Sequence, residues 1–252
     1  MSVAWHSQGM DEVPPDDGWL SRREAAWVAR MRFEKRRSEF RMGRWTAKNA
    51  IALFLDRPRT PEFLRAVLID RAPDGAPVPL VDGAPAPASI SMTDRADQAV
   101  CVVAAPGLAL GVDLELVEPR SDAFVVDFLT ESEQHLVGAA FDAEDRALRA
   151  NLIWCGKESA LKVLRTGLRR DTRSVQVSLP DGPPVDGWGA MTVRAVEGAE
   201  YPGWWRRYGD FVLTVAAAEA FPPPRSLVDP PGLATAVPAH AWWRRPSHGG
   251  TR

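Results

Sequence analysis

Two carboxylates, separated by one residue, follow the apolar run of residues 99–104. Asp113 and Glu115 belong to the next apolar segment, 108–117. Both segments are predicted as strands, and side chains at i and i+2 of a strand project from the same face. Two like charges at that separation repel, so one stays protonated unless a cation lies between them. A hard cation such as Mg²⁺ fits the pair. An edge strand with one solvated face is the alternative.

A second polar group lies on a predicted helix over residues 142–165, which has apolar residues at helical spacing and Gly167 as a stop signal. Trp154, Glu158 and Lys162 are spaced by four and share one face of this helix. Taken alone, Glu158 and Lys162 also fit an ordinary surface pair, which would stabilise the helix by a few tenths of a kcal/mol.

Residues 111–115 (Gly-Val-Asp-Leu-Glu) and 154–162 (Trp-Cys-Gly-Lys-Glu-Ser-Ala-Leu-Lys) together resemble the motifs of one family. They are similar to the strand and helix motifs of 4′-phosphopantetheinyl transferases of the surfactin-synthetase-activating type, in order and in spacing. Residues 128–133 are similar to the family's F-x-x-x-E element. The resemblance covers roughly residues 20–220. It implies transfer of the phosphopantetheine arm of coenzyme A to a serine of an acyl or peptidyl carrier protein, with release of 3′,5′-ADP.

The resemblance also implies roles for individual residues. Asp113, Glu115 and Glu158 would hold Mg²⁺ against the pyrophosphate, and Glu158 has the alternative role of the base that takes the serine proton. Lys162 would contact a phosphate. Lys157 would stabilise the leaving diphosphate or pair with an acid, and Trp154 is interpreted as core packing that sets the helix angle.

A second predicted helix, residues 36–55, carries a basic ridge beside its apolar stripe. The ridge consists of Arg37, Arg41, Arg44 and Lys48. Four cations without an interleaved acid favour an anionic partner, and guanidinium groups suit the phosphates of coenzyme A. A solvated charged face is the alternative.

Two departures from the family pattern affect the predicted coenzyme A site. The family's Ser-His pair is Ser91-Met92 here, and methionine donates no hydrogen bond. Arg95 is expected to supply the missing cation. The family's Gly-Lys-Pro turn is Gly75-Ala76-Pro77, with Arg71 as the substitute for its lysine.

The predicted fold class is α+β: a pseudo-two-fold pair of similar halves, each with a small antiparallel sheet packed on helices. A flexible N-terminus (1–18) precedes an N-terminal half (19–108) that carries the coenzyme A ridge. The C-terminal half (109–220) carries the Mg²⁺ and catalytic motifs, and a Pro-rich tail (221–252), which includes residues 242–245, is expected to be disordered. Ser21 and Glu24 form a capping-box signature for a helix. No residue-level repeat is visible.

The composition limits the possible partners. The net charge of the 252 residues is −2, which argues against nucleic acid or an anionic membrane as a partner. Two cysteines make no disulfide framework, and no apolar run reaches the ~20 residues of a transmembrane helix. Without a signal-peptide pattern, a cytoplasmic location is expected. The length and the two-half layout favour a monomer.

Two other functions stay open. A non-catalytic paralogue would bind coenzyme A or carrier protein without transfer, and an unrelated Mg²⁺-dependent phosphohydrolase would use the same acids. A docking surface for the acidic carrier protein is expected, with Arg169, Arg170 and Arg173 as candidates for its rim.

Overall fold

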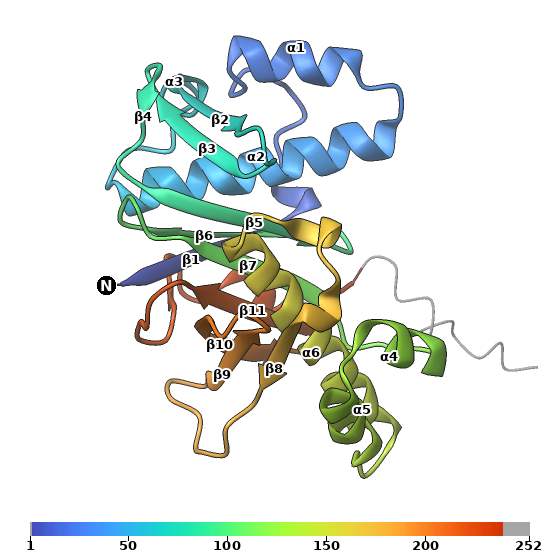
Figure 1. The fold of residues 1–252 in the computed structure, drawn as a ribbon. Coiled ribbons are helices and arrows are strands. Elements are labelled where there is room, and N and C mark those ends of the chain that lie inside the picture. The colour runs from blue at the N-terminus through green and yellow to red at the C-terminus, as the bar shows by residue number, and fades with distance from the viewer. Residues whose placement is uncertain (1, 239–252) are drawn as a thin grey trace, which may run out of the picture.

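The computed structural model describes residues 2–238 and shows an α+β protein of two halves (Figure 1). The N-terminal half contains α1 (Arg22–Arg30), α2 (Glu34–Phe54), α3 (Pro61–Ala66), β2 (Val67–Arg71), β3 (Pro77–Val81), β4 (Ala84–Pro85), β5 (Ser89–Arg95) and β6 (Gln98–Ala104). The C-terminal half contains β7 (Leu110–Leu116), α4 (Asp122–Phe128), α5 (Glu131–Gly138), α6 (Ala143–Val163), β8 (Val175–Ser178), β9 (Gly189–Ala195), β10 (Glu200–Tyr208) and β11 (Phe211–Ala217). The two ends of the chain add β1 (Val3–Gly9) and β12 (Arg225–Ser226).

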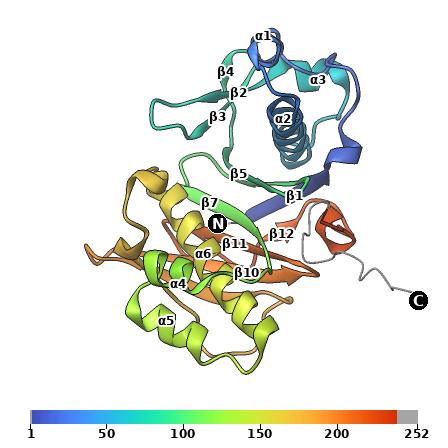
Figure 2. The same cartoon turned by 90° about the vertical axis from the view of Figure 1, so that its right-hand side faces the viewer.

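Two main sheets form the centre of the molecule. The first has the strand order β12-β1-β6-β5 and the second β7-β11-β10-β9-β8, while β2, β3 and β4 make a small third sheet. Strands β1 and β6 pair antiparallel, as do β7 and β11, whereas β1 and β12 run parallel. The long helix α2 packs on the first sheet and α6 on the second (Figure 2). The predicted α+β class with small antiparallel sheets is therefore confirmed.

The two main sheets share an apolar core. Val3 and Trp5 of β1, Val102 of β6, and Leu114 of β7 belong to one buried cluster. Each strand places alternate residues in this cluster, so the opposite faces are left for α2 and α6. The faces that the two long helices cover are where polar residues can be positioned for chemistry.

The N-terminus differs from the prediction of a flexible segment. Residues 3–9 form β1, all seven of whose residues are buried, and β1 pairs antiparallel with β6 along its whole length. The segment has polar residues at alternate positions, His6 and Gln8, and it lacks the long apolar run by which a buried strand is recognised. Burial against β6 and α2 supplies the stability that local sequence does not indicate.

The tail is also partly ordered, in contrast to the prediction. Arg225 and Ser226 pair with Ala4 and Trp5, and Ser7 Oγ accepts a hydrogen bond of 3.1 Å from the backbone N–H of Leu233. Leu233 is buried in the core between the sheets. Residues 242–245 lie outside the described residues.

A residue-level repeat, which sequence inspection did not find, relates the two halves. Ser21 and Glu24 form a capping box at α1, and Thr130 and Glu133 form one at α5. Glu24 binds Lys48 of α2 at 2.6 Å, and Glu133 binds Lys157 of α6 at 2.8 Å, with the same number of residues between acid and lysine in both pairs. The repeat consists of few residues far apart, which is why it is hidden in the sequence.

Most predicted elements agree with the structure. The capping box at Ser21, the long helices, and the strands over 99–104 and 108–117 are confirmed with boundaries shifted by a few residues. β10 was not predicted, because Pro202 and Gly203 interrupt its pattern.

Candidate functional site

Strand β7 carries the two predicted acids on the face that α6 covers. Val112 and Leu114 point into the core between the sheets, so Asp113 and Glu115 face the helix. Gly111 allows α6 to approach, because a Cβ at this position would overlap the carbonyl oxygen of Ser159. The motif glycine therefore brings the acidic strand and the helix into direct backbone contact.

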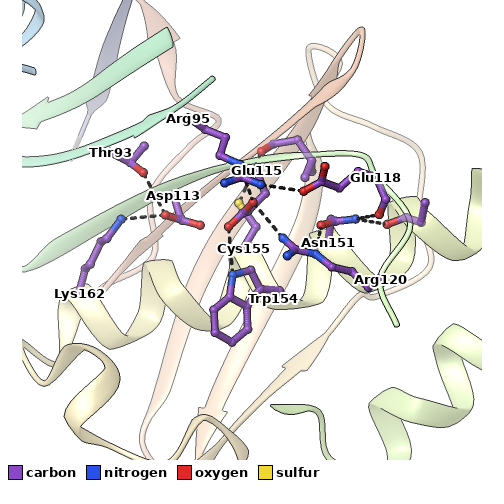
Figure 3. A network of polar contacts seen from close by, with 12 residues as sticks. Thr93, Arg95, Asp113, Glu115, Glu118, Arg120, Asn151, Trp154, Cys155 and Lys162 are labelled. Atoms are coloured by element: carbon purple, nitrogen blue, oxygen red, sulfur yellow. Dashed lines mark hydrogen bonds and ion pairs between the residues drawn. The ribbon is translucent and has the colours of Figure 1, made fainter. Parts of the chain in front are cut away.

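Asp113 is 6% exposed, and one of its oxygens has two partners (Figure 3). Its Oδ1 accepts hydrogen bonds from Lys162 Nζ at 2.8 Å and from Thr93 Oγ1 at 3.0 Å. Lys162 Nζ also donates to the carbonyl oxygen of Val112 at 2.7 Å. The other oxygen of Asp113, Oδ2, is buried without a hydrogen-bond partner among the described residues. A buried carboxylate oxygen without a partner is costly, and a cation or a bound water would satisfy it.

Glu158 of α6 presents a second such oxygen. Its Oε1 is buried and has no hydrogen-bond partner within residues 2–238. Burial, followed by repulsion from the charge of Asp113, raises the pKa of Glu158 to about 7, while Lys162 acts in the opposite direction. Without a metal ion, this carboxyl is therefore divided between its protonated and ionised forms at neutral pH, and a pKa in this range suits a general base.

Glu115, in contrast, is fully engaged with other side chains (Figure 3). Its Oε2 lies 3.0 Å from Arg120 Nη2 and 3.3 Å from Arg95 Nε, and its Oε1 accepts a hydrogen bond of 3.1 Å from Trp154 Nε1. Burial and then repulsion from Asp113 raise the pKa of Glu115, while the two arginines oppose this shift. Its two oxygens are thus committed to donors of the protein itself.

The three predicted metal ligands are therefore not brought together as a set. Among residues 2–238, no three His, Cys, Asp or Glu side chains are grouped so that they could hold a metal ion. The unpartnered oxygens of Asp113 and Glu158 do fit a hard divalent cation, since both are carboxylate oxygens excluded from solvent. Two protein carboxylates plus phosphate oxygens and water are an ordinary Mg²⁺ environment.

A cavity of about 870 Å³ lies between the two halves. Its wall includes Thr93 and Lys162, the two partners of Asp113, but not Asp113, Glu115 or Glu158 themselves. Its walls come from α2, the β2–β3 turn and β5 on one side, and from β7 and the end of α6 on the other. The cationic side chains that line it are Arg44, Arg71, Lys162, Arg165 and Arg169. The acids that line it, in the part of the chain that the structure describes, are Asp70, Asp74 and Asp94. Cations outnumber acids on these walls, so the cavity is suited to a polyanionic ligand.

Four of the predicted coenzyme A residues line this cavity: Arg44, Arg71, Ser91 and Lys162. Ser91 Oγ accepts a hydrogen bond of 3.2 Å from the backbone N–H of Val112, which joins β5 to β7. Met92 and Ala76, which replace the family's histidine and lysine, line the cavity as well. The two residues that differ from the family pattern thus lie on the wall of the cavity that is proposed to bind coenzyme A.

Lys48 and Lys157, two of the predicted site residues, do not line the cavity. Both side chains are fully buried and paired with Glu24 and Glu133, respectively. Lys157 Nζ also donates to the carbonyl oxygen of Thr172 at 2.9 Å, on the side of α6 away from the cavity. Of the two roles considered for Lys157, the pairing with an acid is the one that the structure has.

The remaining residues of the ridge do not line the cavity either. Arg41 forms two hydrogen bonds of 2.8 Å to Asp17, and Arg37 pairs with Glu34. The acids that neutralise Arg41, Arg44 and Lys48 come from the preceding loop and from α1. They were invisible to an argument that considered α2 alone.

Arg95 does not replace the missing histidine. Its guanidinium pairs with Glu115 and with Glu118, the latter at 2.7 Å, and it is not part of the cavity wall. On β5 the side chains of Thr93 and Arg95 follow Ser91 at alternate positions, but the twist of the strand end directs Arg95 to the acids of β7 and the loop after it.

Sequence reasoning missed three residues of this region. Thr93 shares the strand face of Ser91, a signal that was available. Arg120 follows β7 in a loop and gave no signal. Arg165 ends α6 with a φ of 57°, a conformation that is unfavourable for arginine, and its Nη1 lies 3.7 Å from Asp74 Oδ2 across the cavity.

The three arginines expected at the docking rim do not lie in one environment. Arg169 lines the cavity, whereas Arg170 pairs with Glu197 and Arg173 with Asp171.

None of the helices among the described residues is both long and apolar enough to cross a membrane.

Comparison with known proteins agrees with this geometry. Residues 109–216 match the model of the 4′-phosphopantetheinyl transferase superfamily. A search of curated proteins gave no match. The matched segment contains β7 and α6, which carry Asp113, Glu115, Glu158 and Lys162. This part of the chain, less than half of its length, is thus similar to the 4′-phosphopantetheinyl transferase superfamily.

Proposed function

We propose that this protein transfers the 4′-phosphopantetheine arm of coenzyme A to a serine of an acyl or peptidyl carrier protein, in a Mg²⁺-dependent reaction that releases 3′,5′-ADP. The surfactin-synthetase-activating type, monomeric and built of two halves, is the subtype proposed. The observation that carries the proposal is a cation-lined cavity between the halves whose wall includes Lys162, the partner of Asp113. Beside it, Asp113 and Glu158 of the matched segment each keep a buried carboxylate oxygen without a partner among the described residues.

Coenzyme A matches the charge of this cavity. It carries a pyrophosphate and a 3′-phosphate, and guanidinium groups bind phosphates through paired hydrogen bonds. Lys162 lies beside Asp113 and would contact the pyrophosphate at the reacting end. Arg44 and Arg71 are on the opposite wall, where the 3′-phosphate would lie.

Asp113 and Glu158 are the residues that would hold Mg²⁺. When bound, the cation would neutralise charge on the pyrophosphate during phosphoryl transfer. The serine oxygen forms a bond to the phosphorus that bears the pantetheine arm, and the bond from this phosphorus to the oxygen of 3′,5′-ADP breaks. Lys162 supplies a fixed positive charge beside the departing phosphate.

Glu158 has the alternative role of receiving the serine proton, directly or through a water. Its pKa of about 7 suits a general base at neutral pH. Both roles, ligand and base, require the ionised form, which a bound cation would favour.

The carrier protein would approach the C-terminal half. Carrier proteins are acidic helical bundles, and a basic and apolar surface would complement them. Val126, Leu136 and Phe141 are exposed apolar residues on and beside α4 and α5, at 57%, 41% and 83%. Exposed apolar groups gathered on one pair of helices are typical of a docking surface.

The direct test is the mass of an apo carrier protein after incubation with the enzyme, coenzyme A and Mg²⁺. Addition of one phosphopantetheine, abolished by Asp113→Asn, is the expected result. A panel of fatty-acid, polyketide and non-ribosomal peptide carriers would identify the pathway. Turnover of coenzyme A without any carrier protein would instead favour a phosphohydrolase.

A second candidate is a paralogue that binds coenzyme A or carrier protein without transfer. Met92 and Ala76 on the cavity wall favour it, because neither side chain can bind a phosphate. It predicts coenzyme A binding by calorimetry with no mass change on any carrier of the panel.

A further inference from the structure

The three acids of the two motifs differ in what surrounds them. Asp113 and Glu158 each keep a buried oxygen without a partner in the described part of the chain, whereas both oxygens of Glu115 are committed. The cations around Glu115 are themselves anchored. Arg120 Nε donates to Asn151 Oδ1 at 2.7 Å, and Arg95 Nη2 binds Glu118 at 2.7 Å. A carboxylate held by two arginines and an indole is costly to release, so it is a poor candidate for metal ligation.

The hydrogen bond between Glu115 and Trp154 connects the two elements that carry the other acids (Figure 3). Glu115 lies two residues after Asp113 on β7, on the same face of the strand. Trp154 lies one helical turn before Glu158 on α6. A bond of 3.1 Å between their side chains therefore fixes the spacing of strand and helix at the point where the unpartnered oxygens lie.

The indole ring is held on its other side as well. Trp154 packs against Phe124 and Phe128 of α4, with ring centroids 5.2 and 5.3 Å apart. The guanidinium of Arg120 lies 4.6 Å from the centre of the Phe124 ring. Glu115, Arg120 and Trp154 thus form a rigid bracket around the end of β7.

We propose that Glu115 is a positioning residue and not a metal ligand in this protein. It fixes β7 to α6 through Trp154 and stays paired with Arg95 and Arg120, so that Asp113 and Glu158 alone supply carboxylates to the cation. The proposal rests on the Mg²⁺ dependence proposed above and departs from the three-acid set that the family motif implies.

Mn²⁺ binding tests the ligand assignment without measuring turnover. The readout is the decrease of the EPR signal of free Mn²⁺, with coenzyme A present. The informative variant is E115Q/R120Q. It removes one negative and one positive charge, so the net charge of the site is unchanged, and the amide oxygen introduced by E115Q still accepts the hydrogen bond of Trp154. Its Mn²⁺ affinity should lie within about threefold of wild type. E158Q should bind Mn²⁺ at least about tenfold more weakly.

A tenfold loss of Mn²⁺ affinity in E115Q/R120Q would make Glu115 a ligand and overturn the proposal. If that variant does not fold, E115Q alone is compared with E118Q, since each removes one carboxylate from Arg95. Mn²⁺ affinity tenfold weaker in E115Q than in E118Q would make Glu115 a ligand. Wild-type protein that binds no Mn²⁺ would refute the two-carboxylate site. Normal Mn²⁺ binding without transfer to any carrier counts against the proposed function alone.

The positioning role has its own test and control. Trp154→Phe keeps an aromatic ring but removes the N–H, and it should weaken Mn²⁺ binding about three- to tenfold. Trp45→Phe is the matched control, because Trp45 occupies the corresponding place on α2 and its Nε1 has no hydrogen-bond partner among residues 2–238. Equal Mn²⁺ affinities in the two variants would mean that the bracket is only structural and would overturn the positioning role.

Discussion

The two halves have the same frame and different chemistry. Each anchors its long helix with a fully buried lysine and a capping-box glutamate, which also accepts a backbone N–H from a strand, Ile69 in one half and Val177 in the other. At the same spacing from these lysines, Ala4 of β1 corresponds to Asp113 of β7, His6 to Glu115, and Asn49 of α2 to Glu158.

The comparison separates residues that build the fold from residues of the proposed site. The Lys–Glu pairs are present twice and do not line the cavity, so they belong to the frame. The three acids are present once. A repeated motif with one acidic copy is what we expect when function is placed on one half of a duplicated scaffold.

The largest expected effect comes from breaking the buried pairs. Lys157→Met should destabilise the protein by about 3–5 kcal/mol, because it leaves Glu133 buried without its cation. Lys48→Met should cost less, because Arg44 Nε lies 3.6 Å from Glu24 and partly replaces the lysine. Urea denaturation measures both, with Lys157→Met/Glu133→Leu as the control that removes the orphaned charge. Equal losses would show that Arg44 does not compensate.

The next effect contrasts the corresponding positions Glu158 and Asn49. Glu158→Gln should lower kcat by roughly two orders of magnitude, the usual scale for loss of a general base, and leave coenzyme A affinity near wild type. Asn49→Ala should change kcat less than about threefold, because Asn49 has no role in the proposed site. The carrier mass assay and calorimetry give the two readouts. Activity of Glu158→Gln within severalfold of wild type would contradict the catalytic assignment.

The next effect is the pH dependence of the free energy of unfolding that comes from His6, the residue that corresponds to Glu115. Burial, and then the charge of Arg59, lower the pKa of His6 from 6.5 to about 4. Between these two pKa values the unfolded chain therefore binds a proton that the folded protein does not, so the free energy of unfolding falls as the pH falls. The loss from this residue between about pH 7 and about pH 5 should be about 2 kcal/mol.

Urea denaturation of His6→Gln at the two pH values checks the sign. The free energy of unfolding should differ between the two pH values by about 2 kcal/mol less in the variant than in wild type. An unchanged difference would mean that His6 becomes protonated in the folded protein without cost.

The smallest effect concerns the ends of α2 and α6, where Asp56 and Arg165 have φ values of 50° and 57°. Glycine adopts this conformation without strain, and aspartate tolerates it better than arginine does. Arg165→Gly should therefore raise the free energy of unfolding by up to about 1 kcal/mol, and Asp56→Gly by less. Thermal denaturation decides; a lower melting temperature for Arg165→Gly would show that its contact with Asp74 outweighs the strain.

Local signals predicted much of the fold and part of the site. Helical spacing and capping residues located α1, α2 and α6, and the motif residues located Asp113, Glu158 and Lys162. The sequence did not show charge partners from distant elements. Glu24 neutralises Lys48 across two helices, and Arg120 reaches Glu115 from a loop, so the ridge and the three-acid cluster were both predicted as freer than they are.

β1 and β10 were missed for a related reason. Each is stabilised by neighbours on both sides, β1 by β6 and β12 and β10 by β9 and β11, so their polar, proline and glycine residues are accepted by the sheet. Such context outweighs local propensity. In the sequence, each of these two strands has only a weak strand pattern, while the strands that pair with it have stronger ones.

The parallel pairing of β1 with β12 joins the first residues of the chain to a segment near its other end. During synthesis on the ribosome, β1 can pair with β6 once residue 104 has emerged, but its other edge stays open until residues 225–226 follow. The first sheet therefore gains its last strand, β12, only after all strands of the second sheet have been synthesised. A stop codon or protease cut between β11 and β12 would leave an open strand edge, and the product should aggregate even though every catalytic residue is present.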